Sequence, residues 1–199
     1  GKVESDYKGE IINSHPFLSI KYTYEGKEIE VDSQLIGTYN FSNILVAVTV
    51  GHYFGLSTEE TKSGIESYVP ENNRSQLIEK GSNKIILDCY NANPSSMNEA
   101  IINLSVSKSE NKYFVLGDML ELGKESMYEH KRTIAQLNEL NLKGILVGKE
   151  FEKVKQSDFH VFKSNEQAYN YLQNNTINNS LILIKGSRGI KLETVLEVL

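Results

Sequence analysis

Two alternating hydrophobic runs stand near the N-terminus. Apolar side chains occupy every second position over residues 18–24, and the alternation resumes over residues 29–31. Strict alternation is typical of a strand with one buried face, and the Glu25-Gly26 dipeptide between the runs is typical of a turn. The pattern therefore predicts a β-hairpin.

Two helices are predicted next. Residues 43–54 are apolar on all sides, and Gly55 follows them as a residue that readily takes the left-handed conformation at a helix end. We therefore expect a buried helix over this stretch. Ser57 and Glu60 form the capping-box pattern of a second, short helix that stops near Tyr68.

The hydrophobic pattern changes at a polar break. Pro70 precedes the polar stretch 71–75, and such a break favours a loop between compact units. We predict one unit over residues 1–70 and a second over residues 71–199. In the second unit short apolar runs alternate with helical segments, which indicates an α/β fold with a Rossmann-like, mostly parallel sheet. The expected strands are 84–87, 113–116, 144–147, 161–162 and 181–184.

Three helices of this second unit carry start signals. Each signal is a polar cap residue followed by a proline or by a second polar residue three positions later. The pairs are Asn93 with Pro94, Ser126 with Glu129, and Ser164 with Gln167. Helical spacing also places apolar residues on one face of two of these helices, so each helix can cover the sheet. These faces are Met97, Ile101 and Leu104, and Met127, Ile134 and Leu137.

Composition narrows the class of protein. The chain has 199 residues, of which 39% are hydrophobic, with a net charge of -5 and one cysteine. The apolar content suffices for a buried core, yet no apolar run is long enough to cross a bilayer. One cysteine excludes an internal disulfide, and the negative charge disfavours a nucleic-acid surface. We expect a cytoplasmic protein with small-molecule partners, no membrane insertion and no structural metal site.

The first candidate site is the segment DCYNANPSSM, residues 88–97. Asp88 ends a predicted strand, and ligands of open α/β sheets gather at the carboxyl ends of strands. Its carboxylate can accept hydrogen bonds from a ribose. Asn91 and Asn93 offer donors and acceptors, although an Asx-turn and a helix cap explain Asn93 better than a ligand does.

Two further candidates also follow strands. The segment LGDMLELG, residues 116–123, carries Asp118 between glycines that allow close approach of the backbone. A tight, solvated loop is the alternative. The helix after it contains His130, which is more typical of a packed residue than of a base.

The segment KGSRGIKLE, residues 185–193, offers three polar side chains in front of the last predicted helix. Lys185, Ser187 and Arg188 can bind a carboxylate or a phosphate there. A helix lead-in with surface cations is the alternative reading.

One candidate lies in the first unit, in GTYNFSN over residues 37–43. Asn40 and Asn43 are three positions apart where a loop meets a helix, so both amides can face one ligand, and a primary amide can read an adenine edge. Capping of the helix by Asn43 is the alternative. Arg74 lies between the two predicted units, where a cation can meet a phosphate when domains close.

Taken in order, these motifs resemble the Mur ligases. The family pattern Gly-x-His-Asn-x-x-Asn matches residues 37–43, an Arg stands at the domain junction as Arg74 does, and DxYNANPxSM, LGDMLELG and KGSR recur. The motifs DxYNANPxSM and LGDMLELG together point to the branch of the family that adds D-alanyl-D-alanine. The resemblance covers this whole chain and about the C-terminal half of the family's three-domain enzyme.

The resemblance implies an ATP-dependent amide ligase of peptidoglycan synthesis. ATP phosphorylates the carboxylate of UDP-N-acetylmuramoyl-tripeptide, and the amine of D-alanyl-D-alanine attacks the acyl phosphate. The implied nucleotide-binding residues are Asn40 and Asn43 for the adenine, Asp88 for the ribose, Arg74 for the phosphates, and Asn91. The implied substrate-binding residues are Asp118, Lys185, Ser187 and Arg188. We therefore expect Asp88→Ala in the full-length enzyme to weaken ATP binding and to leave folding nearly intact.

Two departures from the family pattern matter. Tyr39 stands where the family has His, and no Gly-x-x-Gly-Lys-Thr phosphate loop or counterpart of the family's Mg²⁺ ligands occurs in the chain. The resemblance therefore implies the last part of the ATP-binding domain over residues 1–70 and the C-terminal domain over residues 71–199, inactive alone. The alternatives are another amide ligase, such as a folylpolyglutamate synthetase, and a nucleotide-binding module without catalysis.

Overall fold

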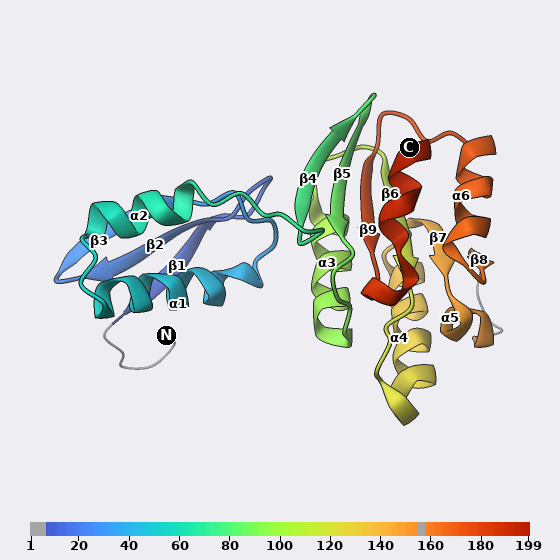
Figure 1. Ribbon diagram of the computed structural model, residues 1–199, viewed down its shortest axis with the longest axis horizontal. Helices are drawn as coiled ribbons and strands as arrows, with labels where there is room; N and C mark the ends of the chain where they lie inside the picture. Colours follow the sequence, from blue (N-terminus) through green and yellow to red (C-terminus); the bar gives the residue numbers. More distant parts are fainter. Residues whose placement is uncertain (1–6, 155–157) are drawn as a thin grey trace. The chain divides into compact units, whose positions relative to one another are not determined.

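The computed structural model describes residues 7–154 and 158–199 and has two compact units, Gly1–Pro70 and Glu71–Leu199 (Figure 1). The first unit contains a three-stranded antiparallel sheet in the order β1-β2-β3. Its strands are β1 Lys8–Asn13, β2 Ser19–Tyr24 and β3 Lys27–Asp32. The predicted hairpin is confirmed as β2 and β3, with Tyr24 opposite Lys27 at the turn.

Two helices accompany this sheet, α1 Asn40–Tyr53 and α2 Thr58–Glu66. The predicted capping box of α2 is confirmed, since Glu60 N–H bonds to the Ser57 hydroxyl and the Glu60 carboxylate accepts the Ser57 N–H. The expectation of an all-buried α1 is wrong. Ile44 and Val48 pack against the sheet, whereas Val46 on another side of the helix is 61% exposed. An apolar sequence does not reveal which helix faces have neighbours.

The second unit is built on a six-stranded sheet in the order β4-β5-β9-β6-β7-β8. The strands are β4 Gln76–Lys80, β5 Asn83–Asp88, β6 Lys112–Gly117, β7 Lys143–Val147, β8 His160–Phe162 and β9 Leu181–Lys185. Only the β4–β5 pair is antiparallel, so the predicted mostly parallel sheet is confirmed. The edge strand β4 is an addition to the predicted strands.

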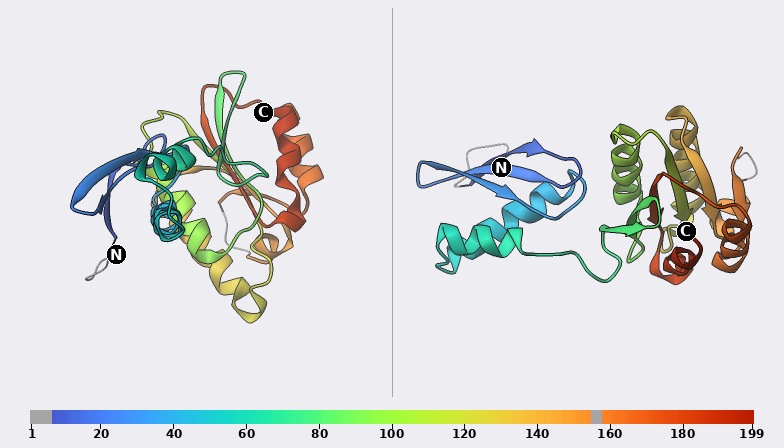
Figure 2. Two further views of the ribbon diagram at one scale, coloured as in Figure 1. Left: turned by 60° about the vertical axis from the view of Figure 1, so that its left-hand side comes forward. Right: turned by 90° about the horizontal axis from the view of Figure 1, so that it is seen from above.

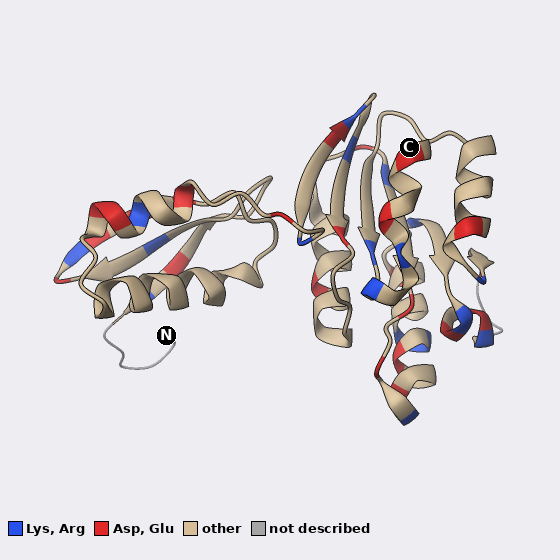
Figure 3. Cartoon of the chain, in the orientation of Figure 1, with Lys and Arg blue, Asp and Glu red and all other residues tan. Residues whose placement is uncertain are grey.

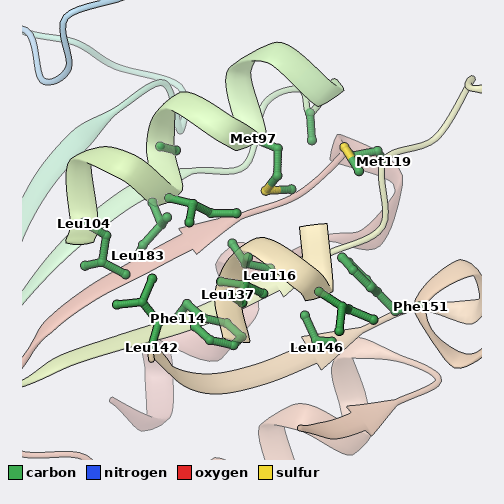
Figure 4. Close-up of a cluster of buried hydrophobic side chains, with 14 of the residues drawn as sticks. Met97, Leu104, Phe114, Leu116, Met119, Leu137, Leu142, Leu146, Phe151 and Leu183 are labelled. Carbon is green, nitrogen blue, oxygen red and sulfur yellow. The ribbon is translucent and has the colours of Figure 1, made fainter. Parts of the chain in front are cut away.

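Helices cover both faces of this sheet (Figure 2). They are α3 Pro94–Val106, α4 Ser126–Glu139, α5 Lys149–Lys153 and α6 Asn165–Asn174, followed by a 3-10 helix over Leu192–Val198. Side chains alternate along β6: Phe114 and Leu116 join α3, α4 and α5 in one core, while Val115 joins α6 and the 3-10 helix in the other. Figure 4 shows the first core, with Met97 and Leu137 reaching the sheet from their helices.

The helix start signals have mixed outcomes. Asn93 and Ser164 accept the expected N–H groups, so both caps are confirmed. Ser126 as a cap is wrong, because a 3-10 turn precedes α4 and makes Glu125 its cap residue. Met127 is 38% exposed, and His130 takes its place on the buried face of α4. The predicted last helix is a 3-10 helix.

Candidate functional site

The three motifs of the second unit meet at one edge of its sheet. Parallel pairing places Asp88 at the end of β5 opposite Lys185 at the end of β9, and Lys185 opposite Leu116 of β6. The strand order β5-β9-β6 therefore brings together the segments that follow these three strands. Such an edge, with several loops and helix starts, is the usual ligand-binding edge of an open α/β sheet.

A buried ion pair lies at the centre of this edge. Lys185 Nζ donates to Asp88 Oδ2 at 2.6 Å and to the Asn91 carbonyl at 3.1 Å, and the Lys185 side chain is 1% exposed. The second Asp88 oxygen accepts the Ser75 N–H at 3.3 Å. Lys185 thus holds Asp88 and the following loop in place, and its predicted contact with a substrate stays a prediction.

Asn91 is exposed and already uses part of its amide. Its side-chain oxygen accepts the N–H of Ala92 at 2.8 Å, and its amide NH₂ group donates to no group among residues 7–154 and 158–199. Asn93 serves as the cap of α3, so the structural alternative holds for that residue.

Ser187 ties two of the loops together. Its N–H donates to the Asp118 carbonyl at 3.0 Å, and its hydroxyl oxygen accepts the Leu120 N–H at 2.9 Å. A side chain at Gly186 would come within 3.1 Å of the Gly117 Cα, so these glycines allow the close approach of the two loops. Ser187 is buried, and this geometry gives it a structural task beside the predicted substrate contact.

Asp118 is buried beneath the same loops. Its two carboxylate oxygens accept the N–H groups of Glu150 and Phe151, each at 2.9 Å, at the start of α5. Burial raises the pKa of the Asp118 carboxyl above its ordinary value of 3.8, against the opposing effect of these two N–H groups. Because both oxygens are used, Asp118 offers little to a ligand as folded, and its predicted substrate contact stays a prediction.

His130 is hydrogen-bonded to the backbone of the LGDMLELG loop. Its Nε2 accepts the N–H of Met119 at 3.1 Å, and its Nδ1 lies 2.7 Å from the Ser126 carbonyl, to which it donates. Both bonds require the neutral imidazole with its proton on Nδ1. The interpretation of His130 as a packed residue is confirmed, since its side chain is fully buried.

An exposed tyrosine joins two of the predicted cations. The guanidinium carbon of Arg74 lies 3.7 Å from the ring centroid of Tyr90, and that of Arg188 lies 5.7 Å from the same centroid. The sequence does not show that Tyr90 meets these arginines, because strand order alone brings the three segments together. Its one signal is an aromatic residue two positions after the candidate Asp88.

The two asparagines of the first unit differ in their surroundings. Asn40 is buried, donates to the Ile36 carbonyl at 2.8 Å and accepts from the Asn43 amide at 2.9 Å. The alternative that Asn43 caps the helix is wrong, because Tyr39 is the cap residue and Asn43 lies inside α1. Asn43 is exposed and lines an apolar groove of about 410 Å³ between α1 and α2, beside Ala47.

Metal clusters and membrane-spanning helices are both absent from the part of the chain that the structure describes. Among residues 7–154 and 158–199, no cluster of three or more His, Cys, Asp or Glu side chains is arranged to hold a metal ion. No helix in that described part is long and apolar enough to cross a membrane. Basic and acidic residues are interspersed along α4 and α5 (Figure 3).

Comparison with known proteins identifies the family. The family model for the Mur ligase, glutamate ligase domain matches residues 73–188, more than half of the chain. The UDP-N-acetylmuramoyl-tripeptide–D-alanyl-D-alanine ligase of Buchnera aphidicola is 36% identical over 97% of this chain. The alignment covers 43% of that relative, so the chain spans less than half of its length.

Solved structures agree in fold. A crystal structure of MurF from Acinetobacter baumannii has a TM-score of 0.84 and 27% identity, covering 96% of this chain and 44% of that one. The MurF ligase of Thermotoga maritima, solved in complex with ADP, has a TM-score of 0.81 and 22% identity, covering 100% and 47%. With a family model over residues 73–188, this chain belongs to the Mur ligase family.

Proposed function

We propose that this chain is part of an ATP-dependent ligase that joins D-alanyl-D-alanine to UDP-N-acetylmuramoyl-tripeptide through an acyl phosphate. The observation that carries the proposal is the meeting of DCYNANPSSM, LGDMLELG and KGSR at the carboxyl ends of β5, β6 and β9. The name of the Buchnera relative supports this substrate pair. The enzyme acts in the cytoplasm, where ATP is available.

The two units have different roles in the proposed enzyme. Residues 71–199 form the C-terminal domain, with the matched segment 73–188 inside it. Residues 1–70 form the last part of the ATP-binding domain, which supplies Asn40 and Asn43. The exposed Asn43 amide reads the adenine edge, and buried Asn40 orients it through the hydrogen bond between their side chains.

The second unit supplies charge and positioning. Arg74 and Arg188 offer guanidinium groups to phosphoryl oxygens, which they can bind through paired N–H donors. Asp88 keeps a position at the rim of the sheet where a ribose hydroxyl can donate to it, and Lys185 fixes its orientation. Asn91, Asp118 and Ser187 shape the loops that face the dipeptide. Catalysis by such residues is electrostatic and depends on a rigid arrangement.

Magnesium is assigned no residue of this chain. Mg²⁺ prefers carboxylate oxygens and water, and no suitable cluster occurs in the described ranges 7–154 and 158–199. Two carboxylates at the sheet edge are occupied, Asp88 by Lys185 and Asp118 by backbone N–H groups. Phosphoryl transfer needs a metal and a phosphate loop, and we infer that these come from other parts of the enzyme. Tyr39 replaces the family His, and its hydroxyl or ring takes over any contact made there.

The proposal is tested by an assay of the enzyme that contains this chain. ATP-dependent phosphate release is measured with UDP-N-acetylmuramoyl-tripeptide, with and without D-alanyl-D-alanine, and the amide product is identified by mass. We expect product only when both substrates are present. A folylpolyglutamate synthetase would instead join glutamate to a folate. A binding module would release no phosphate with either pair of substrates. Either result would reject the proposal.

A further inference from the structure

Three separate segments converge on the ring of Tyr90. Arg74 belongs to the loop before β4, Tyr90 to the loop between β5 and α3, and Arg188 to a short 3-10 helix, Arg188–Ile190, that follows β9. Their side chains meet with Arg74 stacked at 3.7 Å and Arg188 at 5.7 Å from the ring centroid. Tyr90 is 39% exposed, so the cluster lies at the surface. Both distances are within the range of a cation–π contact.

The backbone holds this cluster firmly. The Asn73 carbonyl accepts the N–H groups of Cys89 at 2.9 Å and Tyr90 at 3.2 Å, which fastens the loop of Arg74 to the chain that carries the ring. Ser187, the neighbour of Arg188, is bonded through both its N–H and its hydroxyl to the loop after β6. The two guanidinium groups are therefore presented from a fixed frame.

The two arginines have no acidic partner within the described part of the chain. In residues 7–154 and 158–199, neither Arg74 nor Arg188 pairs with a carboxylate, whereas Arg132 pairs with Glu129 at 3.7 Å. Lys185 is already neutralised by Asp88. Two like charges repel each other, and the negative face of an aromatic ring offsets part of that repulsion. Two positive charges thus lie together with no carboxylate partner among the residues that the structure describes.

The charges also indicate which anion fits. The two guanidinium carbons are no farther apart than the sum of their distances to the Tyr90 centroid, a span that one polyphosphate can bridge. A carboxylate carries one charge and is satisfied by one guanidinium group. A phosphoryl group carries more charge and has three acceptor oxygens, which match the paired N–H donors of two guanidinium groups.

We propose that Tyr90 is a positioning residue that holds Arg74 and Arg188 as the two arms of one binding site for phosphoryl oxygens. The site deepens the proposed ligase function, on which the biological identity of the phosphoryl group rests. Loss of the ring frees both arginines to move apart. Phenylalanine keeps the ring and leucine does not, so the two substitutions separate the π face from other contributions.

The arginine side chains themselves report on this site. The chain contains only three arginines, so its Nε–Hε signals in a ¹H–¹⁵N spectrum belong to Arg74, Arg188 and Arg132. Pyrophosphate should shift the first two and leave Arg132, the internal control, unchanged. In the unliganded chain, the ring current of Tyr90 should shift the side-chain protons of Arg74 upfield. This shift should disappear in Tyr90→Leu and persist in Tyr90→Phe.

Affinity for pyrophosphate gives the quantitative test. Tyr90→Leu should weaken binding about threefold to tenfold, since the contacts to two exposed cations are lost, and Tyr90→Phe should restore it. Arg74→Gln and Arg188→Gln should each weaken binding by at least about tenfold, as expected for a charge-assisted hydrogen bond. These two variants test the site even if Tyr90→Leu does not fold. Unchanged affinity in either arginine variant, or in a folded Tyr90→Leu, would overturn the proposal.

Other anions identify the ligand class. Pyrophosphate stands for a nucleotide, acetyl phosphate for an acyl phosphate and acetate for a plain carboxylate. Tighter binding of either phosphoryl compound than of acetate supports the site and shows which source it prefers, whereas equal binding of acetate rejects it. Shifts of Arg132 equal to those of the other two would show general ion binding and would also reject it. Because these measurements need no turnover, a failed ligase assay with intact pyrophosphate binding would reject only the proposed function.

Discussion

Lys185 Nζ lies 2.6 Å from Asp88 Oδ2, and the two residues stand opposite each other at the ends of neighbouring strands. The sequence assigns them to different ligands, Asp88 to a ribose and Lys185 to a substrate. In the fold they form one unit, in which a fully covered ammonium group has its counter-charge at the protein surface. This pairing changes what a substitution at either position should do.

Asp88→Ala should therefore destabilise the chain, contrary to the expectation from sequence that folding stays nearly intact. It leaves the 1% exposed Lys185 ammonium group without its carboxylate. Breaking a buried pair costs about 3–5 kcal/mol, and partial solvation at Asp88 places the expected loss near the lower value. Urea unfolding measures it. The double variant Asp88→Ala with Lys185→Met is the control and should regain part of the loss. A single variant as stable as the wild type would show that water compensates the ammonium group.

The two asparagines of α1 should separate stability from nucleotide choice. Asn40→Ala removes a buried hydrogen bond to the Ile36 carbonyl and should cost about 1–2 kcal/mol of unfolding free energy. Asn43→Ala removes the partly exposed hydrogen bond to Asn40 Oδ1 and should cost less, about 0.5–1 kcal/mol.

In the complete enzyme, Asn43→Ala should relax the preference for ATP over GTP by about 1–3 kcal/mol, because the wrong base no longer leaves an amide unpaired. Nucleotide competition measures the preference, and maximal rates at saturating ATP should change less. An equal loss of affinity for both nucleotides would contradict base reading by Asn43.

Asp118 should make stability depend on pH in an unusual direction for a carboxyl group. Burial raises its folded pKa above 3.8, so the folded state holds the proton more tightly than the unfolded state. Its favourable contribution is present below the unfolded pKa and is lost as the pH rises through the folded pKa. The stability of the wild type relative to Asp118→Asn should therefore fall as the pH rises from about 4 towards neutrality. Urea unfolding at several pH values tests this, and a rising difference would mean that the N–H groups of Glu150 and Phe151 outweigh burial.

Local chemistry explains which elements the sequence predicts well. The caps Ser57, Asn93 and Ser164 act within four residues of chain, so their signals need no tertiary information. Strands β1 and β4 lack such signals. Most of β1 is exposed, and β4 is an edge strand without fully buried residues, so neither shows a clear alternation. Their structure comes from pairing with a neighbouring strand.

The sequence predicts which motifs form the candidate site, but it does not predict which residues of these motifs contact one another. The rule that ligands gather at strand ends selects Asp88 and Lys185 from sequence. However, β9 is the last strand in the chain and lies between β5 and β6, and this order alone creates the Lys185–Asp88 pair. The same order brings Arg188 to Tyr90. Contacts between residues about 100 positions apart leave no periodicity that a single sequence can show.

The 199-residue chain, purified alone, should fold but should neither hydrolyse ATP nor form the amide. Each unit has its own hydrophobic core, so folding should not need further residues. Phosphoryl transfer needs a phosphate loop, its Lys and bound Mg²⁺, and the sequence contains no Gly-x-x-Gly-Lys-Thr segment to supply them. On the proposed assignments, the contacts left to this chain would be those to adenine, to ribose and to phosphoryl oxygens near Arg74 and Arg188. Residual ATP binding should therefore be weak and insensitive to Mg²⁺.

Calorimetric titration of the chain with ATP, with and without Mg²⁺, checks this expectation beside a phosphate-release assay with both ligase substrates. Arg74→Gln is the control for the phosphoryl contact. Tight Mg²⁺-dependent binding or turnover by this chain would place the phosphate site within residues 1–199 and contradict the assignment of that site to another part of the enzyme.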